Sequence, residues 1–392
     1  MPWKEELLMD QKTQFVSEHL RDALSFTELC QRYHISRKTG YKWISRYEAE
    51  GPPGLIDRSR RPHSSPDQTP EPVRLAIIDA RRRHPSWGAK KLLKLLARKD
   101  PQAHWPSGWT VCEILKREGL VRQKTRRRKT GHPGKPTTIV TAPNQLWCAD
   151  FKGEFKTRHG RYCYPLTVTD SYSRYLLGCQ GLVSTETRGA KEVFKDLFKK
   201  YGLPAAIRSD NGVPFASTAL GRLSQLSVWW IRLGIRRELI EPGKPQQNGQ
   251  HERMHRTLKA EATRPPAANL AQQQRLFNRF RREYNEVRPH EGIELKTPAT
   301  LYEASRRPLP KKVPELIYPA HFETRLVSRN SGIRWNHRWV AVSHTCAGLH
   351  VGLEEVDDGI WDVYLGPVKL GRLLEESYRI EDHLGRLVRR NV

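Results

Sequence analysis

This sequence contains few cysteines and no paired ones. The six cysteines are scattered and form no Cys-x-x-Cys pair, which argues against a disulfide framework and against a cysteine-based zinc site. We expect reduced, buried thiols, as in cytosolic proteins. These residues are Cys30, Cys112, Cys148, Cys163, Cys179 and Cys346.

Long apolar runs are missing as well. No stretch is long enough to span a bilayer, and the start of the sequence lacks the basic-then-apolar pattern of a signal peptide. We therefore expect a cytoplasmic protein without a membrane partner.

Acidic residues are scarce relative to basic ones. The chain has 42 Asp and Glu against 69 Lys and Arg, which gives a formal net charge of +27 and a pI near 10.1. Solubility alone does not need this excess, and the basic residues occur in runs, which favours a polyanionic partner. Nucleic acid is the leading candidate for this partner, and the sequence as a whole predicts double-stranded DNA.

Several domains are expected, because 392 residues exceed one compact core. Residues 1–58 predict three helices, with Ser25 and Ser36 as N-caps of the second and third. A last helix that opens with basic residues favours a helix-turn-helix domain that reads the major groove; an ordinary three-helix bundle is the alternative. The helices are expected at Gln14–Ala23, Phe26–Tyr33 and Arg37–Glu48, and the DNA contacts at Arg37, Lys38, Thr39 and Lys42.

A Pro- and Gly-rich linker at 51–70 leads to a second helical domain, which is helix-turn-helix-like, at 69–122. Its helices are predicted at Val73–Arg83, Ala89–Arg98 and Thr110–Glu118, and Lys90 and Lys91 are expected to face DNA. A basic linker follows at 123–142. Such runs are usually solvated, and following the phosphate backbone is the best functional interpretation. The residues expected to do so are Arg126, Arg127, Arg128 and Lys129.

Residues 143–305 predict a mixed α/β domain, with strand-like runs first and then alternating helices and strands. The strands are expected at Leu146–Phe151, Arg161–Thr169, Tyr175–Val183, Ala205–Ser209 and Arg236–Ile240. The helices are expected at Arg188–Tyr201, near Thr218–Gly234, and at Gln247–Ala262 and Leu270–Tyr284. A Pro-rich linker at 308–319 precedes residues 320–392, whose short strand-like pieces predict a small β-barrel or sandwich.

Three acidic residues, Asp150, Asp210 and Glu252, have contexts that suit metal ligands. The first two end strand-like runs, and the third lies at the front of a helix. Phosphodiester chemistry can use two divalent cations, and Mg²⁺ prefers oxygen ligands. On the helix we expect Met254 and Leu258 to pack inward. We expect His255, Arg256 and Lys259 to share or flank the face of Glu252 and to contact DNA.

Other polar side chains near these acids favour plainer roles. We interpret Asp170 as a structural turn residue, and Glu154, Glu241 and Glu261 as surface groups. His251 and His255 are possible metal ligands, but solvated or phosphate-contacting roles are favoured. The Trp229–Trp230 pair is interpreted as core in preference to a contact surface.

Four segments together resemble the integrase-type core of DDE transposases of bacterial insertion sequences, which is shared with retroviral integrases. They are Trp147–Asp150, Ser209–Gly212, Pro245–Glu252 and Tyr284–His290. The resemblance covers about residues 143–305, and the helix-turn-helix front end is typical of the same elements.

This resemblance implies an RNase H-like fold in which Asp150, Asp210 and Glu252 hold two Mg²⁺ ions, or Mn²⁺ in their place. It implies hydrolysis at the element ends, then attack of the 3′-OH on target DNA by transesterification, by a homo-oligomer in the bacterial nucleoid. The tail would be a small β-barrel that binds DNA. Two features depart from the viral pattern: no His/Cys zinc domain is indicated at the front, and 41 residues separate Asp210 from Glu252.

Three other functions are compatible with parts of the sequence. A structure-selective nuclease on the same fold would use the acids for hydrolysis only. A DNA-binding regulator would need the helix-turn-helix and none of the acids. An inactive transposase is also possible, although its three acids would be intact.

Overall fold

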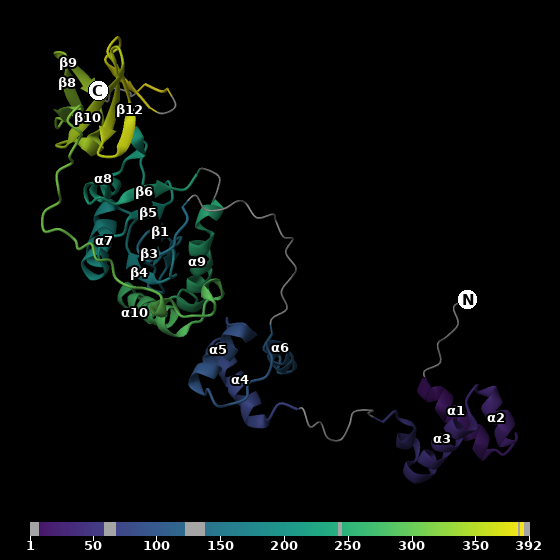
Figure 1. Ribbon diagram of the computed structural model, residues 1–392. Coiled ribbons are helices and arrows are strands. Elements are labelled where there is room, and N and C mark those ends of the chain that lie inside the picture. The colour runs from purple at the N-terminus through teal and green to yellow at the C-terminus, as the bar shows by residue number, and fades with distance from the viewer. Residues whose placement is uncertain (1–7, 59–67, 122–137, 242–244, 383–384, 388–392) are drawn as a thin grey trace. The chain divides into compact units, whose positions relative to one another are not determined.

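The computed structural model describes residues 8–58, 68–121, 138–241, 245–382 and 385–387 (Figure 1). By their internal contacts these residues cluster into two units, divided between Thr69 and Pro70. Within the described residues no helix is long and apolar enough to cross a membrane. The predicted DNA contacts Arg126, Arg127, Arg128 and Lys129 lie outside the described residues.

The first unit contains three helices, and its serine caps are confirmed. Ser25 accepts a hydrogen bond from the backbone N of Glu28, and Ser36 accepts one from Thr39 N. The first helix begins and ends earlier than predicted. It stops before Asp22, where a φ of 50° turns the chain. The helices are α1 (Leu8–Leu20), α2 (Phe26–Arg32) and α3 (Arg37–Glu50).

Close packing of α2 against α3 defines the core of this unit. A Cβ on Gly40 would lie 2.8 Å from Cys30 Sγ and 2.9 Å from the Phe26 ring, so only glycine fits there without movement. Leu55, from the short 3-10 helix Pro52–Leu55, is completely buried in the same cluster. The start of the predicted linker therefore belongs to the helical unit.

The second unit opens with three more helices, close to the predicted positions. They pack around Trp87, which is 1% exposed and lies in the predicted break between the first two. Ser107 caps the third by accepting a hydrogen bond from Thr110 N. The helices are α4 (Glu71–Arg83), α5 (Ala89–Lys99) and α6 (Gly108–Arg117).

A single mixed sheet forms the centre of the second unit, as the predicted α/β domain requires. Its order is β2-β3-β1-β5-β6, and β4 also pairs with β3. The central strand β1 is antiparallel to β3 and parallel to β5. The strands are β1 (Trp147–Phe151), β2 (Phe155–Lys156), β3 (Tyr162–Asp170), β4 (Leu176–Leu182), β5 (Ala206–Ser209) and β6 (Arg236–Leu239).

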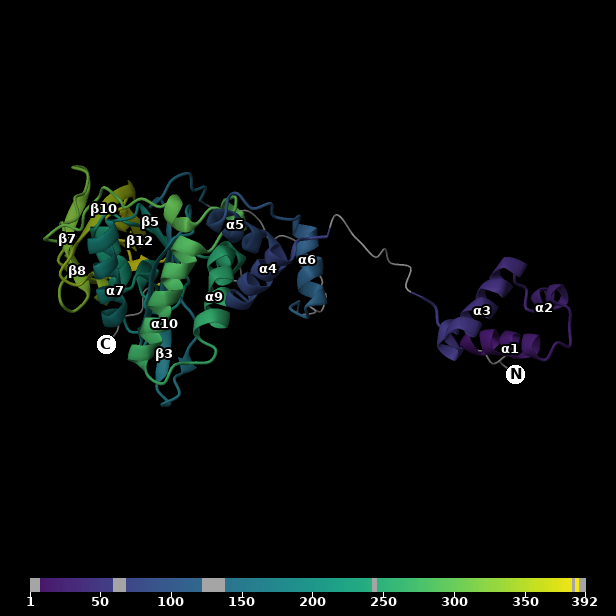
Figure 2. The same cartoon turned by 90° about the horizontal axis from the view of Figure 1, so that it is seen from below.

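Helices cover both faces of this sheet, with α7 and α8 on one side and α9 and α10 on the other (Figures 1 and 2). Trp230 is completely buried and Trp229 nearly so, which confirms the core interpretation of this pair. The segment predicted as one helix near 218–234 is divided, because Ser224 caps a shorter helix. The elements are α7 (Thr187–Tyr201), the 3-10 turn Leu220–Arg222, α8 (Gln225–Arg232), the 3-10 turn Pro245–Asn248, α9 (Gly249–Ala262), α10 (Leu270–Arg282) and the π-helical turn Glu283–Val287.

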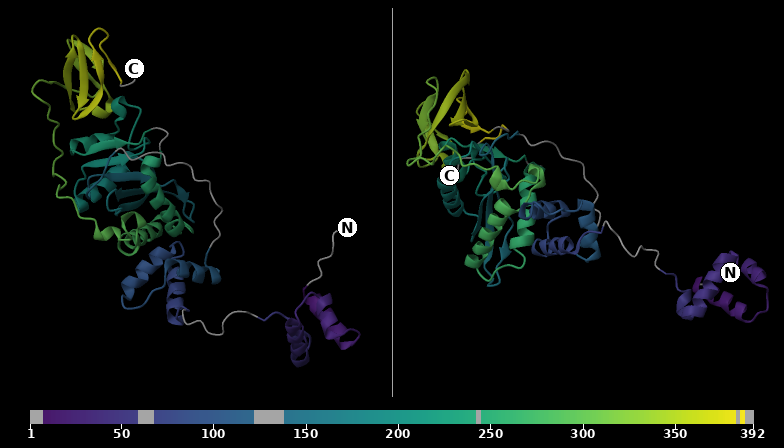
Figure 3. Two further views of the ribbon diagram at one scale, coloured as in Figure 1. Left: turned by 45° about the vertical axis from the view of Figure 1, so that its right-hand side comes forward. Right: turned by 60° about the horizontal axis from the view of Figure 1, so that its bottom comes forward.

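The tail forms two antiparallel sheets, so the expected β-barrel is not confirmed (Figure 3). One sheet has the order β13-β12-β11-β10-β7, the other is the pair β8-β9, and the strands of the described residues do not close into a ring. Both sheets cover one shared apolar cluster, which is closer to the sandwich alternative. The strands are β7 (Glu323–Leu326), β8 (Gly332–Trp335), β9 (Arg338–Ala341), β10 (His350–Asp357), β11 (Ile360–Leu365), β12 (Val368–Leu374) and β13 (Arg379–Glu381).

The Pro-rich segment 308–319 is attached to the domains that it joins. Leu309 and Val313 pack against the core of the mixed sheet, and Leu316 packs against the cluster of the tail. Five of the six cysteines are buried, as expected, whereas Cys112 is exposed. Short 3-10 turns complete the fold at Glu291–Ile293, Pro298–Thr300 and His344–Cys346.

Candidate active site

Asp150 lies near the end of the central strand β1, between β3 and β5. Its side chain is 21% exposed. Burial, and then the negative charge of Asp210 and the weaker effect of Glu252, raise the pKa of Asp150 to about 7. With so high a pKa, this carboxyl group is fully ionised at neutral pH only when a positive charge lies close to it.

Asp210 directly follows β5, the parallel neighbour of β1. In the register of the two strands Cys148 pairs with Arg208, so Asp150 and Asp210 each lie two residues beyond that pair. The backbone N of Gly212 donates a 3.2 Å hydrogen bond to Asp210 Oδ1. Burial raises the pKa of Asp210 against the opposing effect of that bond. The register therefore explains why the charge of Asp210 raises the pKa of Asp150.

Glu252 lies in the first turn of α9, and its side chain is exposed. Arg256 and Lys259 are exposed on the same helix, at the i+4 and i+7 positions. His255, however, is only 7% exposed. It lies on the inner side of the helix with Met254 and Leu258, which differs from the expected DNA-facing position.

The charges of the three acids fit a divalent cation. In the described part of the chain none of them forms an ion pair with a lysine or an arginine, although the protein is strongly basic. Like charges close together at a half-buried site are unfavourable without a counter-charge. Carboxylate oxygens are also the donors that Mg²⁺ prefers.

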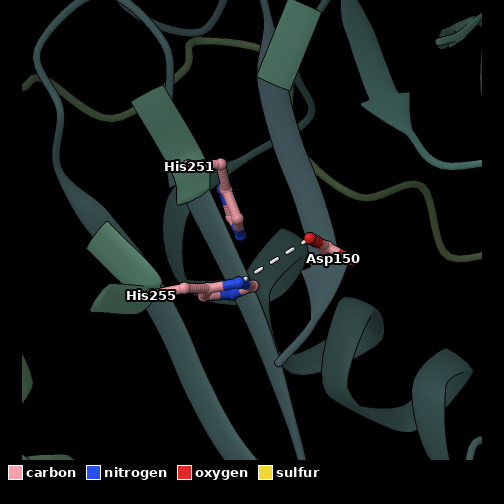
Figure 4. A group of neighbouring side chains, drawn as sticks. All are labelled: Asp150, His251 and His255. Atoms are coloured by element: carbon pink, nitrogen blue, oxygen red, sulfur yellow. Dashed lines mark ion pairs between the residues drawn. The ribbon is translucent and has the colours of Figure 1, made fainter. Parts of the chain in front are cut away.

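Two buried histidines of α9, His251 and His255, lie near Asp150 (Figure 4). Thr167 Oγ1 is 2.7 Å from the Nε2 atoms of both His251 and His255, and Thr169 Oγ1 is 2.9 Å from His251 Nδ1. His255 Nδ1 lies 3.7 Å from Asp150 Oδ2. The favoured interpretation of solvated histidines is therefore wrong.

Burial keeps both imidazoles neutral. It lowers the pKa of His255 to about 3, with a further contribution from Lys152. Burial, then the neighbouring His255, lowers the pKa of His251. The contact of His255 with Asp150, drawn as an ion pair in Figure 4, is consequently a contact between a neutral ring and a carboxyl group.

A buried ion pair that sequence patterns did not reveal supports the site from beneath. Arg208 on β5 faces Glu238 on β6, and its Nε donates a 2.7 Å hydrogen bond to Glu238 Oε1. Nη1 of the same arginine donates to the carbonyl of Gln247, just before α9. The pair thus connects the strand that ends at Asp210 to the helix that carries Glu252.

A small cavity of about 150 Å³ is lined by three cations and one acid, Glu154. Its cations are Lys152, Lys259 and Arg264. Burial, then repulsion from Lys259 and more weakly from Arg264, lowers the pKa of Lys152 against the opposing effect of Asp150. A cluster of cations of this kind suits a phosphate group.

The plainer interpretations of the other acids agree with the structure. Asp170 Oδ1 accepts a 2.8 Å hydrogen bond from Asn144 N, and Oδ2 accepts bonds from Ser173, which confirms a turn role. Glu154 and Glu241 are exposed, as expected. Glu261 is also at the surface, where it forms a 2.7 Å ion pair with Arg288.

The residues expected to contact DNA through the N-terminal helices differ in exposure. On α3, Arg37, Lys38 and Lys42 are exposed, whereas Thr39 is half-buried and its hydroxyl lies 2.9 Å from Ser36 Oγ. On α5, Lys90 is exposed and Lys91 is half-buried. Burial and the positive charge of Arg288 lower the pKa of Lys91, against the opposing effects of Glu291 and Glu261. The side chain of Lys91 therefore lies close to the α/β core.

Family models match the regions where these elements lie. Two models described as Integrase core domain match residues 140–245 and 233–298. A Helix-turn-helix domain model matches residues 11–63, and a Homeodomain-like domain model matches residues 39–115. The chain thus carries an integrase core domain behind a helix-turn-helix domain. The resemblance to insertion-sequence transposases with an integrase-type core is thereby confirmed.

Individual relatives of this integrase-core protein come from insertion elements and retroviruses. The chain is 25% identical over 244 residues to an uncharacterized 31.7 kDa protein of insertion element IS407 from Burkholderia multivorans, covering 60% of the chain and 82% of that protein. It is 30% identical over 195 residues to the Gag-Pol polyprotein of baboon endogenous virus, covering 50% of the chain. The chain spans only 11% of that polyprotein.

Solved structures of viral integrases are similar to part of the chain. The HTLV-2 integrase catalytic core domain in complex with magnesium is 16% identical, with a TM-score of 0.33, and the match covers 41% of this chain and 98% of that one. A chain of the simian T-cell lymphotropic virus intasome is also 16% identical, with a TM-score of 0.37, and the match covers 75% of this chain and 97% of that one.

Proposed function

We propose that this integrase-core protein is a DNA transposase. It binds the ends of a mobile element, cleaves them by hydrolysis, and joins the exposed 3′-OH to target DNA by transesterification. The observation that supports the proposal most is the convergence of Asp150, Asp210 and Glu252 from two adjacent parallel strands and one helix. These acids are the proposed catalytic residues of an RNase H-like core.

The same acids are the proposed ligands of two Mg²⁺ ions, with Mn²⁺ as a substitute. Two bound divalent cations supply activation of the attacking oxygen and stabilisation of the leaving oxygen. Asp150 and Asp210 are fixed by the sheet, and Glu252 is fixed by a helix that packs through Met254 and Leu258. A site built on such elements is held in position before DNA binds.

Basic residues around the acids are proposed to hold the DNA backbone. Arg256 and Lys259 lie on the exposed face of α9 with Glu252. Lys152 and Arg264 join Lys259 at the small cavity. Phosphates bound by these side chains would place a scissile bond beside the acids.

Recognition of the element ends is assigned to the N-terminal helices, with α3 as the major-groove reader. The proposed domains are 1–58 and 69–122 for end recognition, 123–142 as a basic linker, 143–305 for catalysis and 320–392 for further DNA contacts. Two element ends must be held together during the reaction, so we propose at least a homodimer in that complex, acting on the chromosome in the bacterial cytoplasm.

A strand-transfer assay tests this function. Uncut and pre-cut duplexes from the DNA that flanks the gene are incubated in parallel with supercoiled plasmid and Mg²⁺, so that cleavage and joining are measured separately. The full chain should yield joined products, and Asp210→Asn should abolish joining and cleavage while it leaves end binding intact. Asp196→Asn, an exposed aspartate on α7, is the matched control and should remain active.

The outcomes separate the alternatives. Cleavage without any joining would identify a nuclease, and specific end binding that needs none of the acids, with no cleavage, would identify a regulator. Full joining by Asp210→Asn would contradict the proposed catalytic role.

A further inference from the structure

The buried histidine pair on α9 has a nitrogen atom that no hydrogen bond from the described residues uses. Thr167 Oγ1 has three neighbours: the backbone carbonyl of Asp150 at 3.0 Å, and the Nε2 atoms of His251 and His255, each at 2.7 Å. A hydroxyl group carries one hydrogen and two lone pairs. The carbonyl can only accept, so the Thr167 hydrogen is donated to it.

Both imidazoles must then donate to Thr167. Each Nε2 therefore carries the proton, and in a neutral ring each Nδ1 is left with a lone pair. The lone pair of His251 Nδ1 is used, because the hydroxyl of Thr169 lies 2.9 Å away and can donate to it. The Nδ1 of His255 has no such donor among the described residues; instead it faces Asp150 Oδ2 at 3.7 Å.

Two electron-rich atoms that face one another at a half-buried site repel each other unless a proton or a metal cation lies between them, and a separation of 3.7 Å is too long for a proton shared in a hydrogen bond. Their separation suits a shared metal ion. Ligands about 2.1 Å from one ion lie about 3.0 Å apart at right angles and about 3.6 Å apart at 120°. The side chains of Asp150, His251 and His255 offer ligand atoms within 4.8 Å of one another. The hydrogen-bond arrangement excludes His251 from such a set.

We propose that His255 Nδ1 is a nitrogen ligand of the divalent cation that Asp150 holds. This inference rests on the proposed function, because it adds a ligand to the same site. A site with an imidazole ligand accepts transition-metal ions better than a site made only of carboxylates, whereas Mg²⁺ favours oxygen ligands. The position held by Asp150 should therefore bind Mn²⁺ more tightly than Mg²⁺ by a margin that depends on His255.

Pulsed electron paramagnetic resonance of Mn²⁺ bound to the full chain tests the ligand directly. Nitrogen coupling of the imidazole type is expected in the wild-type protein, and uniform [¹⁵N]histidine labelling should replace the ¹⁴N pattern by that of ¹⁵N. Asp150→Asn should remove the bound ion that gives this signal. The labelling experiment needs no substitution at either histidine, so it does not depend on how a variant folds.

Two glutamine variants identify which histidine is the ligand. The amide nitrogen of glutamine occupies the place of Nε2, so each variant keeps a donor for Thr167 and loses only the Nδ1 lone pair. His255→Gln should lose the nitrogen coupling and bind Mn²⁺ about tenfold more weakly, with little change for Mg²⁺. His251→Gln should keep the coupling.

Three results would overturn the inference. The first is bound Mn²⁺ without nitrogen coupling in the wild-type protein, which would leave the proposed transposase function standing because the carboxylates still hold the ion. The second is nitrogen coupling that persists in His255→Gln. The third is loss of coupling in His251→Gln but not in His255→Gln. Failure of strand transfer in a protein with the expected coupling would instead contradict the proposed function alone.

Discussion

Arg208 and Glu238 face one another across the parallel strands β5 and β6 and form an ion pair beneath the candidate active site. Their side chains are 5% and 17% exposed. Arg208 also donates a 3.2 Å hydrogen bond to the carbonyl of Gln247. One guanidinium group therefore connects two strands to the turn that precedes α9. Two of the three candidate catalytic acids, Asp210 and Glu252, therefore depend on the same buried cation for their positions.

Removing Glu238 should destabilise the fold strongly. In Glu238→Ala the guanidinium of Arg208 stays buried without its charge partner, which costs about 3–5 kcal/mol. The free energy of unfolding in urea measures this loss. Glu192→Ala is the matched control: Glu192 forms a 3.6 Å pair with Lys195 at the surface of α7, and its loss should change stability by less than about 1 kcal/mol. Equal effects of the two substitutions would contradict the role assigned to the buried pair.

Asp150→Asn should stabilise the metal-free protein above neutral pH. The pKa of Asp150 is about 7 in the folded chain, raised from its ordinary value by burial and by the neighbouring acids. Ionised Asp150 therefore costs stability on the order of 3 kcal/mol above pH 7, and this cost disappears as pH falls from about 7 to about 4. Thermal unfolding in a chelator should show a higher Tm for the variant at pH 8 and no difference at pH 4.

The two controls for this prediction are a metal ion and a distant aspartate. Added Mg²⁺ should raise the Tm of the wild-type protein at pH 8 and leave that of Asp150→Asn nearly unchanged. Asp196→Asn should match the wild-type Tm throughout. A Tm of Asp150→Asn below that of the wild-type protein at pH 8 in chelator would show that ionised Asp150 does not destabilise the fold.

Gly40→Ala should loosen the first helical unit. The added Cβ would lie 2.8 Å from Cys30 Sγ and 2.9 Å from the Phe26 ring, and overpacking of this kind costs about 1–3 kcal/mol. Amide hydrogen exchange read by mass spectrometry should be faster across 8–58. Gly108→Ala is the control, because no atom lies within 4 Å of its Cβ position, and it should leave exchange at 108–117 unchanged or slower. Unchanged exchange in Gly40→Ala would show that α2 and α3 can separate without cost.

Lys90 and Lys91 should contribute differently to DNA binding, although they are adjacent. Lys90 is exposed, whereas Lys91 is half-buried near Arg288 and Glu261. Replacing a lysine that contacts a phosphate lowers the slope of log K against log salt by about one. We therefore expect Lys90→Ala to reduce the slope for element-end DNA and Lys91→Ala to leave it unchanged. Equal changes would mean that α5 leaves its position beside the core when DNA binds.

Local sequence signals predicted most of the elements. Ser25 and Ser36 cap helices where their side chains can reach backbone N–H groups, and the strands with strong apolar patterns lie within a few residues of their expected limits. The positions of Asp150 and Asp210 could be predicted for the same reason, because each acid comes at the end of a buried strand. What each strand pairs with is a long-range property. For that reason the pattern of the tail predicted strands but not whether its sheets close.

The side-chain network around His255 shows where the sequence stops being informative. Three residues after Glu252, His255 lies at the border between the exposed and buried faces of α9, and helical spacing alone permits either. Its hydroxyl partner Thr167 is 88 residues away in sequence. The ion pair of Arg208 and Glu238 was not predicted for a similar reason. The partner of a charged residue in a strand can be identified only when the neighbouring strand is known.

Helix α8 contributes to two hydrophobic cores at once, with Leu226 and Trp230 packed in the core of the mixed sheet and Val228 and Ile231 packed in the core of the tail. Loss of residues 320–392 would therefore do more than remove the proposed DNA contacts of the tail. The shortened product would carry all three acids and would expose the apolar side chains of Val228 and Ile231 that the tail normally covers. Copies of the gene that lose the codons for residues 320–392 should thus be silenced by aggregation of the product, even though every residue proposed for the chemistry is still encoded.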